Sequence, residues 1–156
     1  MTNKVRPVGI NHVAIEVGDI DEALAWYGEL FELDVRSRNE RAAFISLGDQ
    51  FINLSAGREQ APDSARHFGL VVTDKEVVRA RLDELGIPPL PGRFLDFLDP
   101  WGNRVEIIGY TNIQFTKADH VLRGMGLEGL EKNESARAEL RAKGICLLYT
   151  SPSPRD

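Results

Sequence analysis

Two histidines and one glutamate have the types and the placement of a metal-binding set. His12 stands in the β-rich run GINHVAIEV, His67 in the run RHFGLVV, and Glu106 in the apolar run RVEII. Side chains alternate between the two faces of a strand, so in each run every second residue shares a face. If these strands converge, two imidazoles and one carboxylate form a facial triad with positions open for substrate or oxygen. Fe(II) suits this set best, with Mn(II), Ni(II) and Zn(II) as alternatives, because ligand type alone does not select the metal.

Each of these residues also has an ordinary structural explanation. A single histidine in a strand is more often a satisfied core or surface residue than a ligand, and Glu106 could face solvent on a one-sided sheet. A carboxylate buried in an apolar strand, however, needs a partner or a metal. The matching placement of the two histidines favours the metal, since His12 and His67 lie seven residues before Asp19 and Asp74.

Two further carboxylates are candidate catalytic groups. Asp96 alternates with Phe94 and Leu98. If it points into the pocket it could act as an acid or base, and otherwise it is an exposed strand aspartate. Glu16 shares the predicted face of His12, where it could orient a histidine or remain a charge at the rim.

The elements that position these residues form a weak internal duplication. In the first unit, Asp19 and Glu22 form a predicted capping box, and the helix that follows has an apolar stripe from Ala23 to Phe31. Two short strands, AAFISLG and FINLSA, then flank a Gly48-Asp49 turn. This unit therefore has a strand, a helix and at least two more strands.

The second unit repeats the order. RHFGLVV is a predicted strand, and Thr73 with Glu76 forms a second capping box. Gly86 ends the helix, and prolines at positions 88, 89 and 91 prevent it from resuming. RFLDFLD and RVEIIGY are predicted strands joined by the turn over residues 100–103. Two copies of one supersecondary unit imply a joint sheet, and hence an α+β fold.

These patterns divide the chain into three parts. Residues 8–110 form the predicted domain, with module 1 at about 8–58 and module 2 at about 65–110. Helical patterns at about 116–123 and 134–143 place a helical extension at 111–145, as peripheral helices or an oligomer contact. Residues 146–156 contain two Ser-Pro pairs and are interpreted as a disordered or non-native tail.

Composition narrows the class of protein. The chain has 156 residues, 42% of them apolar, and a net charge of −5 with no Lys/Arg run, which argues against nucleic-acid binding. No stretch approaches the roughly 18 apolar residues of a membrane span, and the polar N-terminus lacks a secretory core. The single cysteine, Cys146, excludes an internal disulfide framework. We expect a cytoplasmic protein that binds a small molecule, with no membrane or nucleic-acid partner.

Three segments, INHVAIEVGDIDEALAWYGELFELD, HFGLVV and FLDPWGNRVEII, resemble the vicinal oxygen chelate superfamily. That group includes glyoxalase I, extradiol dioxygenases, methylmalonyl-CoA epimerase and bleomycin- and fosfomycin-resistance proteins. The last segment matches its Asp-Pro-x-Gly-Asn-x-x-Glu pattern from Asp99 to Glu106, and the resemblance covers about residues 10–108. It implies two tandem βαβββ modules that form a cupped, half-barrel mixed sheet around a metal, and a homodimer.

The resemblance also assigns positions for ligands. Family ligands map onto His12, Asn53, His67 and Glu106. Glyoxalase-like members usually hold a glutamate where this chain has Asn53, which puts glyoxalase I activity in doubt and leaves Asn53 as a candidate substrate-binding residue. The remaining two histidines and one glutamate resemble the set of extradiol dioxygenases and some fosfomycin-resistance enzymes. Extradiol enzymes generally carry a tyrosine where this chain has Asp96, which weakens that assignment.

Three functions are therefore open. The three-ligand set favours an Fe(II) extradiol-type dioxygenase acting on a small aromatic or enolisable substrate. The alternative is a non-redox enzyme, either a glyoxalase-, epimerase- or isomerase-like lyase or a thiol transferase, in which the metal polarises a carbonyl. A bleomycin-resistance-type binding protein is the third, and the three ligands argue against it. Oxygen consumption separates the first from the second.

Overall fold

The structure, a computed structural model, describes residues 5–145, so Cys146 and the tail predicted at 146–156 lie outside the described residues. Its elements in chain order are β1 (His12–Val17), α1 (Ile20–Gly28), β2 (Asp34–Arg38), β3 (Ala42–Ser46), β4 (Phe51–Ala56), β5 (Phe68–Val72), α2 (Lys75–Glu84), β6 (Leu95–Leu98), β7 (Arg104–Gly109), the 3-10 helix η1 (Tyr110–Asn112), α3 (Asp119–Gly124) and α4 (Glu134–Ala142).

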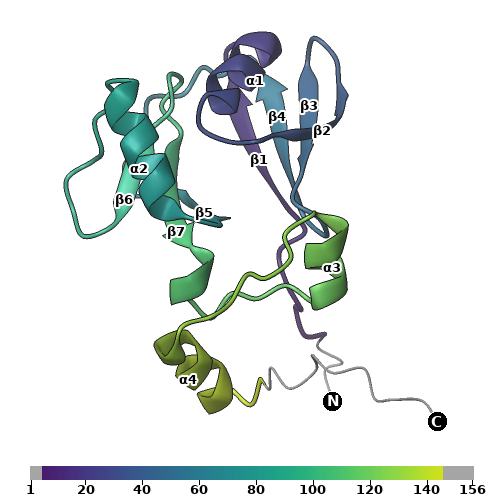
Figure 1. The fold of residues 1–156 in the computed structure, drawn as a ribbon. Coiled ribbons are helices and arrows are strands. Elements are labelled where there is room, and N and C mark those ends of the chain that lie inside the picture. The colour runs from purple at the N-terminus through teal and green to yellow at the C-terminus, as the bar shows by residue number, and fades with distance from the viewer. Residues whose placement is uncertain (1–4, 146–156) are drawn as a thin grey trace.

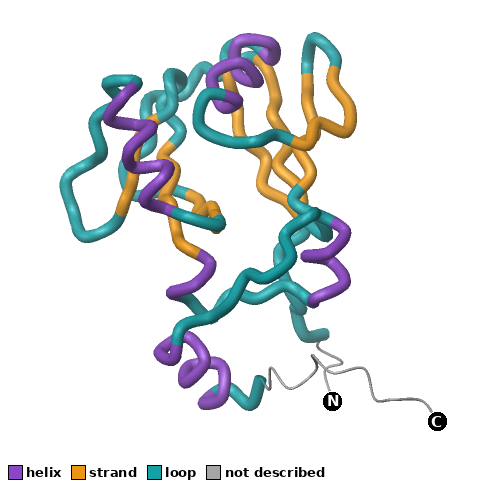
Figure 2. Tube along the Cα trace, viewed as in Figure 1, coloured by secondary structure: helices purple, strands orange, loops and turns teal. Residues whose placement is uncertain are grey.

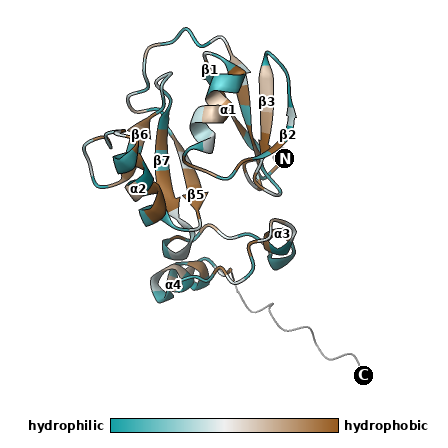
Figure 3. Ribbon diagram, turned by 45° about the horizontal axis from the view of Figure 1, so that its top comes forward, coloured by the Kyte–Doolittle hydropathy of each residue, from teal (hydrophilic) through white to brown (hydrophobic). Residues whose placement is uncertain are grey.

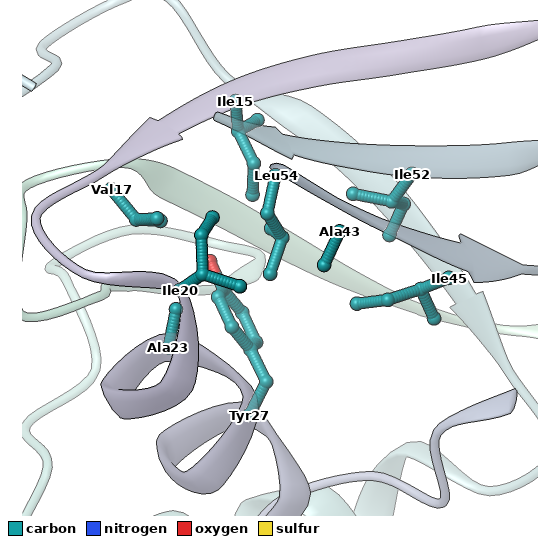
Figure 4. Packing of buried hydrophobic residues seen from close by; sticks show 9 residues of the cluster. All are labelled: Ile15, Val17, Ile20, Ala23, Tyr27, Ala43, Ile45, Ile52 and Leu54. Carbon is teal, nitrogen blue, oxygen red and sulfur yellow. The ribbon is translucent and has the colours of Figure 1, made fainter. Parts of the chain in front are cut away.

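Module 1 is a four-stranded sheet with one helix on its inner face. The strand order is β1-β4-β3-β2, with β1 parallel to β4 and the remaining neighbours antiparallel. Alternate residues of β1, β4 and β3 point toward α1 and are buried with it, as Figure 4 shows. The buried set is Ile15, Val17, Ile20, Ala23, Tyr27, Ala43, Ile45, Ile52 and Leu54. The other face of the same strands carries His12.

The βαβββ plan implied by the resemblance includes a strand at the position of β2, but no sequence pattern located it. Each of its five residues, DVRSR, is exposed, because β2 lies at the edge of the sheet. A strand with neither face buried has no alternation of apolar and polar residues, which is the signal that identifies strands in a sequence. Its pairing with β3, including a register shift between Val35 and Ser37, comes from the tertiary structure alone.

Module 2 has one strand fewer. Its order is β5-β7-β6, with β5 parallel and β6 antiparallel to β7. The segment that corresponds to β2 contains Pro88, Pro89 and Pro91, which have no backbone N–H for a strand ladder. The segment still contacts β6, because the Leu90 N–H donates to the carbonyl of Asp96 at 2.7 Å.

The two helix starts give one confirmed prediction and one wrong one. Asp19 caps α1, and its side chain accepts the N–H of Glu22 at 2.9 Å, as predicted. Thr73 does not cap α2. Asp74 does, by accepting the N–H of Glu76 at 2.9 Å. An aspartate carboxylate is a strong N-cap acceptor, so the helix starts one residue later than the Thr73 capping box implies.

The two modules lie side by side with their helices toward each other (Figures 1 and 2). Leu30, just after α1, is buried among the core residues of module 2, and Phe68 and Leu70 of β5 pack against the core of module 1. Figure 3 shows that hydrophobic residues are concentrated on the strands of both modules. The apolar face of each sheet therefore lies on the side of its helix and of the other module.

The predicted α+β fold of paired modules with C-terminal helices is confirmed, but the two modules do not form one joint sheet. The sheets remain separate within the described chain, and β1 and β5 are both edge strands with one neighbour each. The extension places α3 and α4 below the modules in Figure 1, close to where the sequence predicts helices, with His120 on α3. None of the helices between residues 5 and 145 is long and apolar enough to cross a membrane.

Candidate metal centre

His67 and Glu106 lie together on the open face of module 2, the face turned away from its helix. His67 directly precedes β5, Glu106 lies in the middle of β7, and Gly69 of β5 pairs with Glu106. The Nε2 atom of His67 is 3.2 Å from Oε2 of Glu106. The Nδ1 atom of His67 is 2.9 Å from the Ala65 carbonyl oxygen, an acceptor that fixes the proton on Nδ1. Nε2 is then the ring nitrogen that faces the carboxylate.

His12 has the same arrangement of its ring in module 1. Its Nδ1 atom is 2.9 Å from Oδ1 of Asn11, and Nε2 has no hydrogen-bond partner among residues 5–145. Its ring stacks on Phe51 of the neighbouring strand β4, with centroids 4.7 Å apart and planes 10° apart. Both histidines therefore have a hydrogen-bonded Nδ1 and an available Nε2, as metal-binding histidines generally do.

One chain does not bring the three predicted ligands together. His12 lies on a different sheet from His67 and Glu106, and residues 5–145 contain no group of three His, Cys, Asp or Glu side chains that could hold a metal. The pair on module 2 supplies two of the three predicted ligands. His12 remains the predicted third ligand, and it would have to come from a second copy of the chain.

The turn between β6 and β7 holds Glu106 in register. The Asp99 carboxylate accepts the backbone N–H groups of Trp101 and Asn103 at 3.0 and 2.8 Å, and the Tyr27 hydroxyl at 2.7 Å. Burial and then the adjacent Asp99 carboxylate raise the pKa of Tyr27 well above its ordinary value, so its hydroxyl stays protonated and donates. The Asp-Pro-x-Gly-Asn pattern is therefore a buried structural corner, and Glu106 follows three residues later.

A buried arginine ties this corner to the linker between the modules. The Arg58 side chain is 4% exposed and donates to Oδ1 of Asn103, to the Gly102 carbonyl and to the Asp63 carboxylate. Burial alone would raise the pKa of Asp63, but hydrogen bonds from Arg66 and Arg58 outweigh it and hold this pKa below its ordinary value. The sequence analysis missed Arg58, because a lone arginine in a polar linker carries no signal.

Asp96 is buried beside Glu106. The two residues are opposite each other across β6 and β7, and Asp96 is 3% exposed. Arg104, two residues before Glu106, donates to Oδ2 of Asp96 through Nε at 2.7 Å and through Nη2, while Oδ1 of Asp96 has no hydrogen-bond partner. Its contacts with Arg104 suit Asp96 to a positioning role or to the role of a base.

Glu16 and Asn53 occupy the open face of module 1. Glu16 accepts a hydrogen bond from Gln60, and the residue that orients His12 is Asn11. Asn53 pairs with Ala14 across β4 and β1. Its amide nitrogen is 3.5 Å from the Ser55 hydroxyl, and its Oδ1 has no partner. Their predicted catalytic and substrate-binding roles remain predictions.

The family model described as the Glyoxalase/Bleomycin resistance protein/Dioxygenase superfamily matches residues 9–107. The chain belongs to this superfamily. The match spans both modules, from three residues before β1 into β7, and ends before the helical extension. Membership agrees with the paired modules and with the Asp99 corner.

Two curated relatives are thiol transferases. The glutathione transferase FosA of Serratia marcescens is 26% identical over 110 residues, covering 63% of this chain and 78% of FosA. The metallothiol transferase FosB of Shouchella clausii is 25% identical over 114 residues, covering 64% and 78%. A structure of a mutant of the fosfomycin resistance protein FosX from Listeria monocytogenes, complexed with Mn(II) and 1S,2S-dihydroxypropylphosphonic acid, has a TM-score of 0.56 at 18% identity, covering 65% of this chain and 90% of FosX. At that identity it supports the fold alone.

Proposed function

We propose that the chain is a non-redox, divalent-metal-dependent enzyme, a transferase or lyase that acts on a small molecule with neighbouring oxygen atoms. His12, His67 and Glu106 would hold the metal. Mn(II) is the first choice, ahead of the Fe(II) that the ligand count alone suggests. A bound divalent ion would act as a Lewis acid on the substrate oxygens.

The observation that carries the proposal is the His67–Glu106 pair. Nδ1 of His67 donates to a backbone carbonyl, so Nε2 is the ring nitrogen that faces the carboxylate oxygen of Glu106, 3.2 Å away. A proton on Nε2 can bridge the two atoms, and a divalent cation can take the place of that proton and bind both. Nitrogen and oxygen donors of this kind suit a divalent ion.

The relatives support non-redox chemistry. FosA and FosB are named as thiol transferases, FosB as a metallothiol transferase, and the FosX complex contains Mn(II). The donor set of this chain is compatible with Mn(II), which accepts imidazole and carboxylate ligands. Asp96 stands where an extradiol enzyme is expected to have a tyrosine, and it accepts a hydrogen bond from Arg104.

A second copy of the chain would complete the site. β1 and β5 are edge strands with free ladder groups, and their open faces carry or adjoin His12 and His67. A cleft of about 880 Å³ separates the modules; it is lined by apolar residues of both, including Leu54, Phe68 and Val77. Burial of these surfaces against a second copy would set β1 of one chain beside β5 of the other. His12 of each copy would then face the His67–Glu106 pair of the other.

The chain's own residues would orient substrate and metal. The Asn11 and Ala65 oxygens fix the two imidazole tautomers. Arg104 holds the Asp96 carboxylate beside Glu106, where it could accept a proton from a nucleophile such as a thiol.

The proposal is tested by metal binding followed by electron paramagnetic resonance of Mn(II), with wild type beside Glu106→Ala and His67→Ala. We expect one Mn(II) per chain in wild type and at least a hundredfold weaker binding in both variants. Anaerobic assays of thiol addition to small oxygen-bearing electrophiles should then give Mn(II)-dependent turnover. Activity that requires O2 and iron would contradict the non-redox assignment.

Complementation tests the shared site separately. Neither His12→Ala nor Glu106→Ala should bind Mn(II) tightly alone, but co-refolded mixtures should recover about a quarter of the wild-type sites by random pairing. Recovery arises because each mixed dimer has one intact site and one doubly altered site. If the mixture recovers no binding, the three ligands do not come from two chains.

A further inference from the structure

Module 1 presents an aromatic surface beside His12. Phe51 lies under the His12 ring, and Phe44 of β3 lies next to Phe51 with centroids 5.7 Å apart and planes at 51°. Phe44 is 38% exposed although it is in a central strand, because it points to the open face, opposite to the buried Ala43 and Ile45. These three rings, His12, Phe51 and Phe44, are called the aromatic wall.

Most neighbouring side chains on this face are short, and Glu16 of β1, which accepts a hydrogen bond from Gln60, is the charged exception. Going from the aromatic wall toward the other end of the strands, the paired positions are Ala14 with Asn53 and Ala42 with Ser55. Short side chains leave the faces of the larger rings uncovered, and the stacking surface is available to a flat group. Phe44 is exposed and Phe51 is half-buried under the stacked His12 ring, so a ligand ring that covered Phe44 would remove apolar surface from water.

The opposite module contributes an aliphatic surface next to Glu106. Gly69 pairs with Glu106, and a Cβ atom at Gly69 would lie 2.8 Å from Cδ1 of Ile108. The Ile108 side chain therefore crosses the position that a side chain at residue 69 would occupy. In a shared site, a ligand would have aromatic rings on one side and Ile108 on the other.

The arginines on the strands of both modules already form ion pairs with aspartates. Arg104, the cation on the open face of β7, directs Nε and Nη2 to Asp96 and Nη1 to the Ser64 carbonyl at 2.5 Å. On β2, Arg36 pairs with Asp34 and Arg38 with Asp21. A phosphonate dianion would find no unpaired arginine on the described strands, and taking Arg104 from Asp96 would leave a buried carboxylate without its partner.

We infer that the substrate carries an uncharged aromatic or heteroaromatic ring that stacks on Phe44 and Phe51 while its neighbouring oxygens reach the metal. This rests on the proposed function for the position of the metal, and it extends that proposal from a small oxygen-bearing molecule to an aryl compound. Phe44 and Phe51 are then specificity-determining residues, and Phe44 is the better probe because its recorded ring contact is with Phe51 and not with His12.

The test compares benzohydroxamate with acetohydroxamate on the Mn(II)-loaded protein by calorimetry. The two chelators have the same metal-binding head and differ in a phenyl or methyl group. Stacking should make benzohydroxamate bind at least about fivefold more tightly. Phe44→Leu should reduce that ratio toward one and leave acetohydroxamate binding unchanged. Val35→Ala is the control, because Val35 is also 38% exposed but lies on the other face of the sheet.

Equal binding of the two hydroxamates in wild type would overturn the aromatic inference and leave the metal site standing. A metal-free titration decides the case in which Mn(II) does not bind. Benzyl alcohol, compared with 2-methylpropanol, should shift the ring resonances of Phe44 and Phe51, and Phe44→Leu should at least halve its apparent affinity. Absence of both effects would overturn the inference, whatever the metal result.

Discussion

The two modules share one plan but differ in the chemistry of their open faces. Module 1 has four strands and offers the aromatic wall with one imidazole. Module 2 has three strands, and its open face carries ionisable side chains, namely the His67–Glu106 pair beside the Asp96–Arg104 ion pair. The duplication therefore gives two unlike half-sites, one suited to apolar contact and one to a cation. A site that needs both must combine modules, which is why one chain alone leaves the ligands apart.

The modules also differ in how their last strands are held. The β3–β4 turn of module 1 is a short hairpin around Gly48, whereas the β6–β7 turn of module 2 is a buried polar corner around Asp99. This corner reaches across to module 1 through Tyr27 and through the Glu16 carbonyl, which accepts from Asn103 at 2.9 Å.

Asp99→Ala should destabilise the protein most, by about 3–5 kcal/mol, because it leaves buried donors on Tyr27, Asn103 and the turn backbone without an acceptor. Urea unfolding followed by circular dichroism measures the change. Asp49→Ala, in the turn of module 1, is the comparison and should cost less, because it removes one ion pair with Lys117 and not an acceptor shared by several buried donors. Equal losses at the two turns would show that the corner is not special.

Asp96→Leu should cost about 2–4 kcal/mol, since it leaves the partly buried Arg104 guanidinium without its carboxylate. The double variant Asp96→Leu with Arg104→Met should recover most of that loss, because two apolar side chains replace the pair. The four proteins form a double-mutant cycle measured by chemical unfolding. Additive losses would mean that the two side chains act independently and that the ion pair does not organise the module 2 face.

The extension adds a pH-dependent contribution that neither module supplies. Lys132 donates to the carbonyl oxygens of Tyr110, at 2.5 Å, and Phe115, and burial lowers its pKa to about 8. In the unfolded chain its pKa is about 10.5, so between these values the unfolded state binds more protons and stability rises with pH. We expect a gain on the order of 1 kcal/mol, followed by thermal unfolding from about pH 8 to 10.

Lys132→Met should remove this rise. The raised pKa of Tyr27 acts in the opposite direction above about pH 10, where the unfolded tyrosine ionises first. The two effects are therefore separated by measuring below pH 10. A wild-type protein whose stability falls steadily over that window would contradict the assignment to Lys132.

Phe44→Leu should change stability least, by about 0.5 kcal/mol or less, because the ring is exposed on the open face. Phe97→Leu in module 2 is the contrast, since Phe97 is fully buried and its loss should cost 1 kcal/mol or more, of the order of other core truncations. Thermal melting of both variants provides the comparison. A large loss in Phe44→Leu would indicate a structural role and weaken its assignment to substrate recognition.

The sequence by itself determined the duplicated plan and most elements. Residues buried on one face produce periodic patterns, which identify α1, α2 and the strands of both cores, and turn residues such as Gly48 mark the boundaries. It also singled out His12, His67 and Glu106, because residue type and matched spacing are properties of the chain. Where burial left no pattern, as in the exposed strand β2, or where two caps competed, as at Thr73 and Asp74, prediction failed.

Only the tertiary structure decided which of these residues meet. Two sheets with helices between them separate His12 from Glu106, and this depends on contacts between residues far apart in sequence, such as Leu30 with the core of module 2. The same holds for Arg58 with Asn103, for Arg104 with Asp96, and for the ring stack of His12 on Phe51. Sequence fixes the side chains available to each strand, but register and packing between strands determine which of them share a site, because those contacts are made across the fold and not along the chain.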